Sequence, residues 1–206
     1  MQLTRKEAYN MNTSCITTGR ILASYYLYNK EYEAASETAQ STLEALRKLR
    51  LDTGLLITAT ETVLLVVLAT SLIYYQSPKH HPQAEKLFDM ILSRKPRSME
   101  ALVGVARIAL QAGELELAIQ YSSKAVEIGP HNVEAKMEHA WALALSHDVE
   151  KGKRELEETL PLIDGRDPRS RATVAEIWWR IGKCLLHEGI LSRLSEINNY
   201  RFRNSE

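Results

Sequence analysis

The sequence lacks the features of a secreted or membrane-spanning protein. It has only two cysteines, Cys15 and Cys184, which are too few for a disulfide framework, and its first residues contain no apolar signal-peptide segment. One apolar run, residues 62–75, falls short of the roughly 20 residues that a membrane span needs. We therefore expect a cytoplasmic protein with reduced thiols, a buried helix at residues 62–75 and no membrane contact.

An excess of charge of one sign is also missing. Lys and Arg together number 26, and so do Asp and Glu, so the formal net charge is zero. This balance gives no overall attraction toward nucleic acid or an anionic membrane. The short basic run at residues 47–50 follows Glu44, and we interpret it as a solvated helix end that the helix dipole favours. Direct binding of nucleic acid is not expected.

What the sequence does contain is a repeat. Ala84 and Ala118 lie 34 residues apart, as do Pro96 and Pro130 (118 − 84 = 130 − 96 = 34). Within residues 99–132, apolar residues first follow helical spacing, and a second helical stripe begins after Gly113 and ends before Pro130. The repeating unit is therefore a pair of amphipathic helices, which hides its apolar stripes by stacking on neighbouring pairs.

Small and capping residues fit such helix pairs. Ala106, Ala118 and Ala125 lie where two antiparallel helices would cross closely, and larger side chains there would push the helix axes apart. Ser98 and Asn132 occupy the positions expected of helix N-caps.

The spacing of these residues resembles the tetratricopeptide repeat family. The string Trp178-x2-Ile181-Gly182-x2-Leu185 is its most recognisable part, whereas His139 and Gly152 stand where Leu and Ala are usual in the family. The resemblance implies an all-α fold, a right-handed superhelical solenoid of antiparallel helix pairs. It divides the chain into an N-terminal extension (1–15), a weak first repeat (16–49), a helical extension and linker (50–64), repeats at 65–98, 99–132 and 133–168, the first helix of a fifth repeat (169–189) and an atypical C-terminal tail (190–206).

A closer resemblance comes from longer strings. Residues 74–88 (YYQSPKHHPQAEKLF), 91–96, 155–160, 164–170 and 175–185 (AEIWWRIGKCL) resemble the superkiller protein 3 (Ski3) family. That family is the tetratricopeptide scaffold of the Ski complex, so the resemblance implies protein partners, namely a Ski2-like helicase and Ski8-like WD40 subunits. It also implies support of cytoplasmic 3′-to-5′ mRNA decay by the exosome. Family members are far longer, and the similarity stops after Cys184.

Candidate reactive sites are few. No nucleotide-binding loop and no nucleophile motif is present, and no His or Cys has zinc-type spacing with either cysteine. We interpret His80 and His81 as turn residues, with His81 capping the next helix. Glu134 and Glu138 share a helix face next to His139, but we expect Glu138 to be solvated and His139 to be a hydrogen-bonded, neutral core residue. No catalytic residue, metal or cofactor is expected, and the chain is not predicted to be an enzyme.

The first helix of each pair lines the concave side of such a superhelix. Its outward positions are unusually apolar here, which indicates a surface covered by a partner or by neighbouring repeats. Both interpretations stay open, as does a generic co-chaperone or adaptor module that binds a short peptide. The predicted partner-binding residues are Val103, Arg107, Leu110, Met137, Trp141, Trp179 and Lys183.

Overall fold

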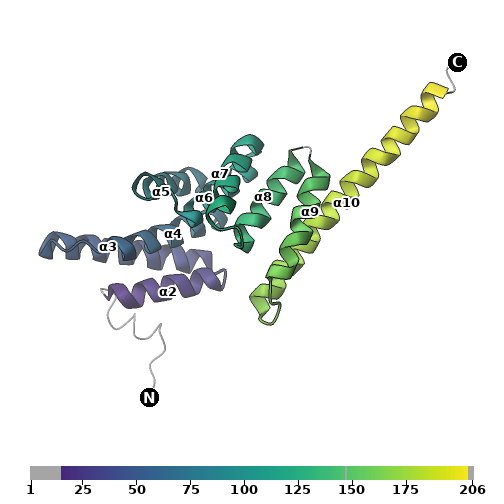
Figure 1. Cartoon of the computed structure of the whole chain (residues 1–206). Helices are drawn as coiled ribbons and strands as arrows, with labels where there is room; N and C mark the ends of the chain where they lie inside the picture. Colours follow the sequence, from purple (N-terminus) through teal and green to yellow (C-terminus); the bar gives the residue numbers. More distant parts are fainter. Residues whose placement is uncertain (1–14, 147, 204–206) are drawn as a thin grey trace. The chain divides into compact units, whose positions relative to one another are not determined.

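The computed structural model describes residues 15–146 and 148–203, and over those residues it contains helices, turns and no β-strand (Figure 1). The predicted all-α class is therefore confirmed. The chain forms two compact units, Met1–Gln111 and Ala112–Glu206. The expected N-terminal extension lies outside the described residues, apart from Cys15. None of the described helices combines the length and the hydropathy needed to cross a membrane.

Consecutive helices pack on one another in the first unit. The pairs α2/α3 and α4/α5 correspond to the first two expected repeats, and α3 also packs on α4. The helices are α2 (Ile16–Tyr28), α3 (Tyr32–Thr53), α4 (Thr58–Tyr74), α5 (His81–Arg94) and α6 (Met99–Ala112), the last of which ends at the unit boundary.

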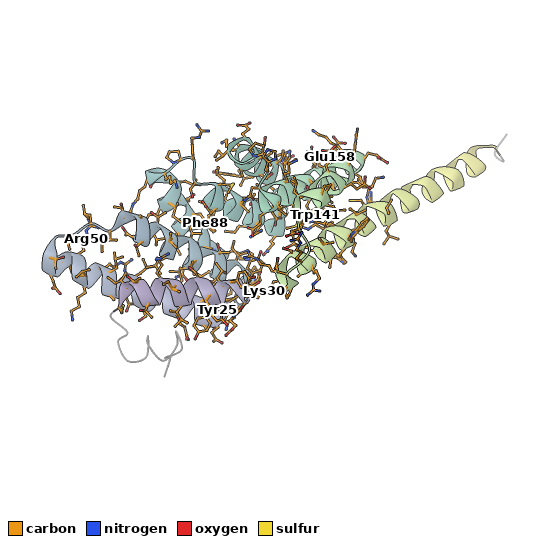
Figure 2. The ribbon with its side chains drawn as sticks, turned by 60° about the horizontal axis from the view of Figure 1, so that its bottom comes forward. Tyr25, Lys30, Arg50, Phe88, Trp141 and Glu158 are labelled. Atoms are coloured by element: carbon orange, nitrogen blue, oxygen red, sulfur yellow. The ribbon has the colours of Figure 1, made fainter. Side chains whose placement is uncertain are left out.

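A glycine sets the distance between α5 and α6. Phe88 is fully buried, and Figure 2 labels it within the first unit. A Cβ atom built on Gly104 would overlap the Phe88 ring. The missing side chain of Gly104 is therefore what lets α6 approach the largest fully buried side chain of the described core.

The linker between the first two pairs is shorter than expected. The helical extension expected from residue 50 is part of α3, which runs to Thr53 and ends at Gly54, whose φ of 71° closes the helix in the left-handed conformation. However, α4 already begins at Thr58, before the boundary expected at residue 65. The apolar run at residues 62–75 forms most of α4, and its inward side chains are buried, so the predicted buried helix is confirmed.

His81 does not cap α5 through its side chain, so that prediction is wrong. It is the first residue of the helix and is buried. Its Nε2 lies 3.2 Å from the backbone oxygen of Ile73 and 2.9 Å from Oγ of Ser77. The ring turns back toward the end of α4 because an otherwise unsatisfied helix-terminal carbonyl is available there. His81 therefore ties the two helices of one pair together.

The second unit is built in the same way. Asn132 caps α8 as predicted, since its Oδ1 accepts a hydrogen bond of 2.8 Å from the backbone N–H of Ala135. The helix α7 packs on α8, α8 on α9, and α9 on α10. The elements of the second unit are α7 (Leu115–Ile128), α8 (Val133–Leu145), α9 (Val149–Thr159), the short 3₁₀ helix η1 (Leu160–Leu162) and α10 (Pro168–Arg203).

Close packing of α8 and α9 depends on Gly152. A Cβ atom at this position would lie 2.5 Å from the backbone oxygen of Ala140 and 2.6 Å from the backbone nitrogen of Ala144. Around this contact, helices α8, α9 and α10 share one core. Its buried members are Met137, Ala140, Ala144, Leu156, Ile177, Ile181 and Cys184.

The last helix differs from the expected division. It runs without a break across the boundary expected at residue 189, as far as Arg203. No proline follows residue 189 to stop the helix, and a lone glycine at that position lowers helix stability without ending the helix. The sequence therefore continues α10 where a tetratricopeptide pair would turn.

Candidate protein-binding surfaces

Three of the predicted partner-binding residues lie on α6. Val103 is only 4% exposed, so it cannot present a surface to a partner, and its prediction as a binding residue is corrected. The reason is that α6 is apolar on nearly its whole circumference, with buried residues at successive positions from Ala101 to Ala106. Arg107 and Leu110 are half-buried and stay candidates.

The other four lie in the second unit, where the structure separates them into core and surface. Met137 is 4% exposed and belongs to the shared core of α8, α9 and α10, so it too is corrected. Trp141 is half-buried against that core, whereas Trp179 is 57% exposed and Lys183 is exposed. The helical spacing does not distinguish Met137 from Trp141, because only the position of α10 decides which of them is covered.

Trp141, Trp179 and Lys183 come together. The two indole rings lie 6.0 Å apart between centroids at an angle of 46°, and Nζ of Lys183 lies 5.4 Å from the centre of the Trp179 ring. Leu186, 60% exposed, follows Lys183 by three positions and Trp179 by seven, which places it on the same face of α10. We call these four residues the tryptophan edge.

An ion pair that the sequence did not reveal supports this edge. Glu138 and Arg180 are only 3% and 7% exposed, and Nη1 of Arg180 lies 3.3 Å from Oε2 of Glu138. Arg180 also donates to the backbone oxygen of Met137 at 3.0 Å and to Glu176 at 2.7 Å, and its guanidinium lies 5.5 Å from the centre of the Trp141 ring. The prediction that Glu138 is solvated is therefore wrong. The pair joins α8 to α10 and fixes Trp141.

His139 is hydrogen-bonded, as predicted, but it is partly buried at the edge of the core. Its Nδ1 lies 3.1 Å from Oγ of Ser122, which itself donates to the backbone oxygen of Ala118 at 2.6 Å. Burial lowers the pKa of His139, and this effect outweighs the attraction of Glu155, whose Oε2 lies 3.9 Å from Nε2. Since the Ser122 hydroxyl uses its proton on Ala118, Nδ1 carries the hydrogen of the neutral ring. His139 is therefore a structural link between α7 and α8.

The lowered pKa predicts a loss of stability in mild acid. The unfolded chain takes up a proton at His139 near pH 6.5, while the folded chain resists it to a lower pH, so the free energy of unfolding falls as the pH drops below about 6.5. Thermal unfolding between pH 7.5 and 5 measures this dependence. In His139→Gln the same decrease should be smaller, whereas His131→Gln, at an exposed position, should retain it. An unchanged pH dependence in His139→Gln would contradict the assignment.

A second exposed apolar surface lies in the first unit and was missed from the sequence. At the end of α3 and in the turn that follows, Leu51 is 86%, Leu55 59%, Leu56 63% and Ile57 37% exposed. Figure 2 labels Arg50 at this end of the helix. A group of exposed apolar side chains of this kind is typical of interaction sites. The run of leucines was visible in the sequence, but its position in an extended turn was not.

No three His, Cys, Asp or Glu side chains in residues 15–146 and 148–203 gather in a way that could hold a metal ion. Cys15 is half-buried and Cys184 is buried, and both side chains are thiols. A hydrogen bond from the Thr18 hydroxyl lowers the pKa of Cys15. The surfaces described above are suited to contact with other macromolecules.

Comparison with known proteins agrees with this architecture. Residues 79–133 match the family model described as tetratricopeptide repeat. A thermophilic tetratricopeptide repeat protein from Thermus thermophilus superposes with a TM-score of 0.61 over 92% of this chain and 96% of its own, at 17% identity. The chain therefore has the tetratricopeptide repeat fold. YrrB, a tetratricopeptide repeat protein with an unusual peptide-binding site, superposes with a TM-score of 0.53 at 13% identity, covering 91% and 84%.

Two curated relatives of this chain are Superkiller protein 3 of two yeasts. The protein of Schizosaccharomyces pombe is 26% identical over 88% of this chain, and that of Saccharomyces cerevisiae is 30% identical over 82%. The chain spans 13% and 12% of their respective lengths. The resemblance to the Ski3 family is thereby confirmed.

Proposed function

We propose that the chain is a non-catalytic scaffold segment that binds partner proteins through the tryptophan edge. The observation that carries this proposal is the exposure of Trp179 beside Trp141 and Lys183 on a helix whose position is fixed by a buried ion pair. Trp and Arg are enriched among residues that dominate binding energy, and rigid aromatic side chains lose little conformational entropy on binding. A preformed pair of indole rings therefore offers more binding energy than an equal area of flexible surface.

The chemistry of the edge defines the partner surface that fits it. The indole faces and Leu186 favour an apolar or aromatic side chain, and Lys183 favours a carboxylate near it. We further propose that the chain belongs to a Ski-like assembly with a Ski2-like helicase and Ski8-like WD40 subunits, and its similarity to Superkiller protein 3 supports this proposal. In that role it supports exosome-dependent mRNA decay in the cytoplasm by holding proteins together, and it performs no chemistry of its own.

Replacement of Trp179 by alanine tests the proposal. In cells that express the tagged protein, wild-type protein should capture a helicase and a WD40 protein, and Trp179→Ala should capture at least tenfold less, since a central aromatic contact contributes about 2 kcal/mol or more to binding. The melting temperature should change little, because the side chain is already more than half exposed. Quantitative mass spectrometry of the captured proteins measures the effect.

The chain offers a matched control at the next position. Trp178 is 55% exposed, almost the same as Trp179, but it points from a different side of α10 because successive helical residues are about 100° apart. Trp178→Ala should therefore capture as much as wild type. Equal capture by all three proteins, or recovery of chaperones without a helicase, would contradict the proposal.

A further inference from the structure

The apolar turn at residues 51–57 shares one end of the first unit with the turn at residues 95–98. The first turn joins α3 to α4 and the second joins α5 to α6, and α4 packs on both α3 and α5. The start of α4 contacts the end of α5 directly, since Nη1 of Arg94 lies 3.3 Å from Oε2 of Glu61. The two turns therefore lie at the same end of the unit, and Lys30 lies at the opposite end of α3 (Figure 2).

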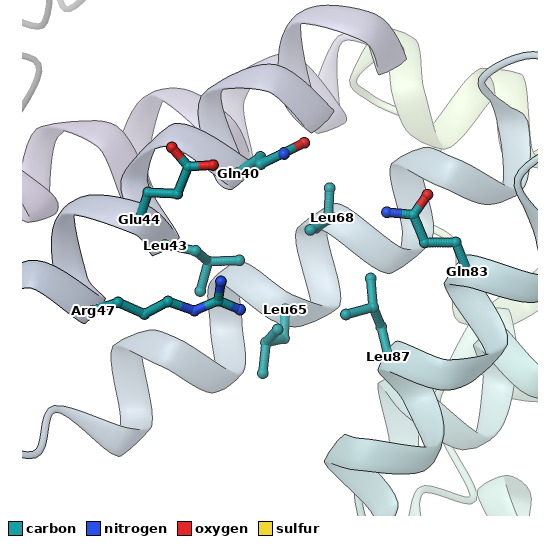
Figure 3. A pocket seen from close by; sticks show the side chains of 8 residues that line it. All are labelled: Gln40, Leu43, Glu44, Arg47, Leu65, Leu68, Gln83 and Leu87. Atoms are coloured by element: carbon teal, nitrogen blue, oxygen red, sulfur yellow. The ribbon is translucent and has the colours of Figure 1, made fainter.

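Cations are concentrated at the end that holds these two turns. Arg94 is already paired, and Arg47 turns its guanidinium toward Leu65 in the crevice bounded by α3, α4 and α5 (Figure 3). The acidic residues in and next to the two turns are Asp52 and Glu100. They are outnumbered by four further basic residues, all of them exposed, namely Lys48, Arg50, Lys95 and Arg97. This end is therefore positively charged, although the net charge of the whole chain is zero.

The apolar side chains at this end are accessible. Leu51, Leu55 and Leu56 are each more than half exposed, and Ile57 is exposed as well. A Cβ atom built on Gly54, in the middle of the turn, would meet no atom within 4 Å, so no other element covers the turn there. Exposed aliphatic side chains beside cations are typical of surfaces that lie in a membrane interface. The aliphatic groups enter the boundary of the acyl chains, while the cations stay among anionic headgroups.

A nucleic acid fits this surface less well than a lipid membrane does. Proteins that bind single strands without sequence preference combine their cations with aromatic side chains, on which the bases stack. No aromatic residue occurs in residues 33–73 or 89–120, which contain both turns. On a phosphate backbone the exposed leucines would stay in water, whereas a lipid surface removes them from water.

We propose that this end of the first unit binds the surface of an anionic lipid membrane. The aliphatic side chains of the first turn enter the boundary between headgroups and acyl chains, and the cations of both turns contact the headgroups. The overall charge gave no indication of such an attraction, because it averages the cations of this end with carboxylates elsewhere in the chain. The proposal goes beyond the scaffold function, since it adds a membrane-binding surface to the unit that does not carry the tryptophan edge.

Sedimentation of the full chain with sucrose-loaded vesicles tests the proposal. The probes are vesicles of phosphatidylcholine alone and vesicles in which about one third of the lipid is phosphatidylserine. The anionic vesicles should bind the chain at least tenfold more tightly, because each cation near an anionic surface contributes about fivefold. Raising the salt concentration from about 0.1 M to about 1 M should remove this preference, since it shortens the Debye length from about 10 Å to about 3 Å.

Two double variants separate the apolar contribution from the electrostatic one. Leu55→Ser with Leu56→Ser should bind the anionic vesicles at least tenfold more weakly, because two aliphatic side chains no longer leave water. Lys95→Glu with Arg97→Glu changes the other turn and should lose the preference for phosphatidylserine. All four side chains are exposed, so both variants should keep the melting temperature of the wild type.

The opposite end of α5 provides a matched control. Lys79→Glu with Lys86→Glu makes the same change of charge at exposed positions near the start of α5, a helix about 20 Å long, and should bind vesicles as wild type does. Trp179→Ala should also bind as wild type, which keeps this test independent of the tryptophan edge. The proposal is overturned if both kinds of vesicle bind equally, if neither turn variant weakens binding, or if the control weakens it as much. Binding of single-stranded RNA without binding of either vesicle would also overturn it.

Discussion

Replacing Gly152 by alanine should destabilise the second unit, although alanine is the usual residue of the repeat family at this position. The new Cβ atom would lie 2.5 Å from the Ala140 oxygen and 2.6 Å from the Ala144 nitrogen. Both are backbone atoms of α8, so the clash is relieved only by moving one helix away from the other. Overpacking of this kind costs about 1–3 kcal/mol, more than the roughly 1 kcal/mol that alanine gains over glycine inside a helix.

Gly182 is the matched control. It also lies inside a helix, but a Cβ atom there would meet no atom within 4 Å. Gly182→Ala should therefore raise the midpoint of chemical denaturation, while Gly152→Ala should lower it. If both substitutions stabilised the protein to a similar extent, the close approach of α8 and α9 would be contradicted.

Replacing Arg180 by alanine should have the largest effect of a single substitution in the second unit. It leaves the Glu138 carboxylate buried without its guanidinium and removes the hydrogen bond to the Met137 oxygen. Removing one member of a buried ion pair typically costs about 3–5 kcal/mol. Urea denaturation monitored by tryptophan fluorescence measures the loss, and it also reports on the neighbouring Trp141 and Trp179.

A double substitution distinguishes the effect of an unpaired buried charge from the effect of lost side-chain packing. Glu138→Leu together with Arg180→Met leaves no buried charge and keeps much of the volume, so it should be much more stable than Arg180→Ala and close to wild type. The explanation fails if Arg180→Ala unfolds at the same urea concentration as wild type. It also fails if the double variant is as unstable as the single one.

Local features of the fold could be predicted because they depend on nearby residues. The end of α3 at Gly54 follows from the left-handed conformation that glycine adopts, and the start of α8 follows from the capping oxygen of Asn132. The 34-residue spacing set the helix pairs in the same way, because each pair has the same apolar stripes to bury. The continuation of α10 beyond residue 189 was not predicted. The family pattern suggested a turn there, but the sequence contains no residue that ends the helix.

Burial that depends on a third helix could not be predicted. Met137 and Trp141 lie one turn apart on the same face of α8, and only the position of α10 buries Met137 in the core while leaving Trp141 at the tryptophan edge. The same helix turns Glu138 from an expected surface residue into a buried one by bringing Arg180 from 42 positions away. The role of Gly152 also depends on a second helix. The sequence shows that glycine replaces the usual alanine of the family, but only the structure shows how close α8 and α9 come at this position.

The candidate sites were predicted only in part. Trp141, Trp179 and Lys183 meet as a cluster, whereas the apolar turn at residues 51–57 was not foreseen. In the sequence, the leucines at residues 51–57 lie in an expected linker. Either flanking helix could have covered their side chains, so their exposure did not follow from the sequence.

Hydroxyl-radical footprinting of the captured complex tests the central claim most directly. The measurement compares side-chain oxidation at Trp178 and Trp179 in the free protein and in the complex with its partners. Both side chains are more than half exposed in the chain alone, so both should be oxidised readily. In the complex, Trp179 should be oxidised several-fold more slowly while Trp178 is unchanged, whereas equal oxidation of Trp179 in the free and bound protein would contradict a binding role for the tryptophan edge.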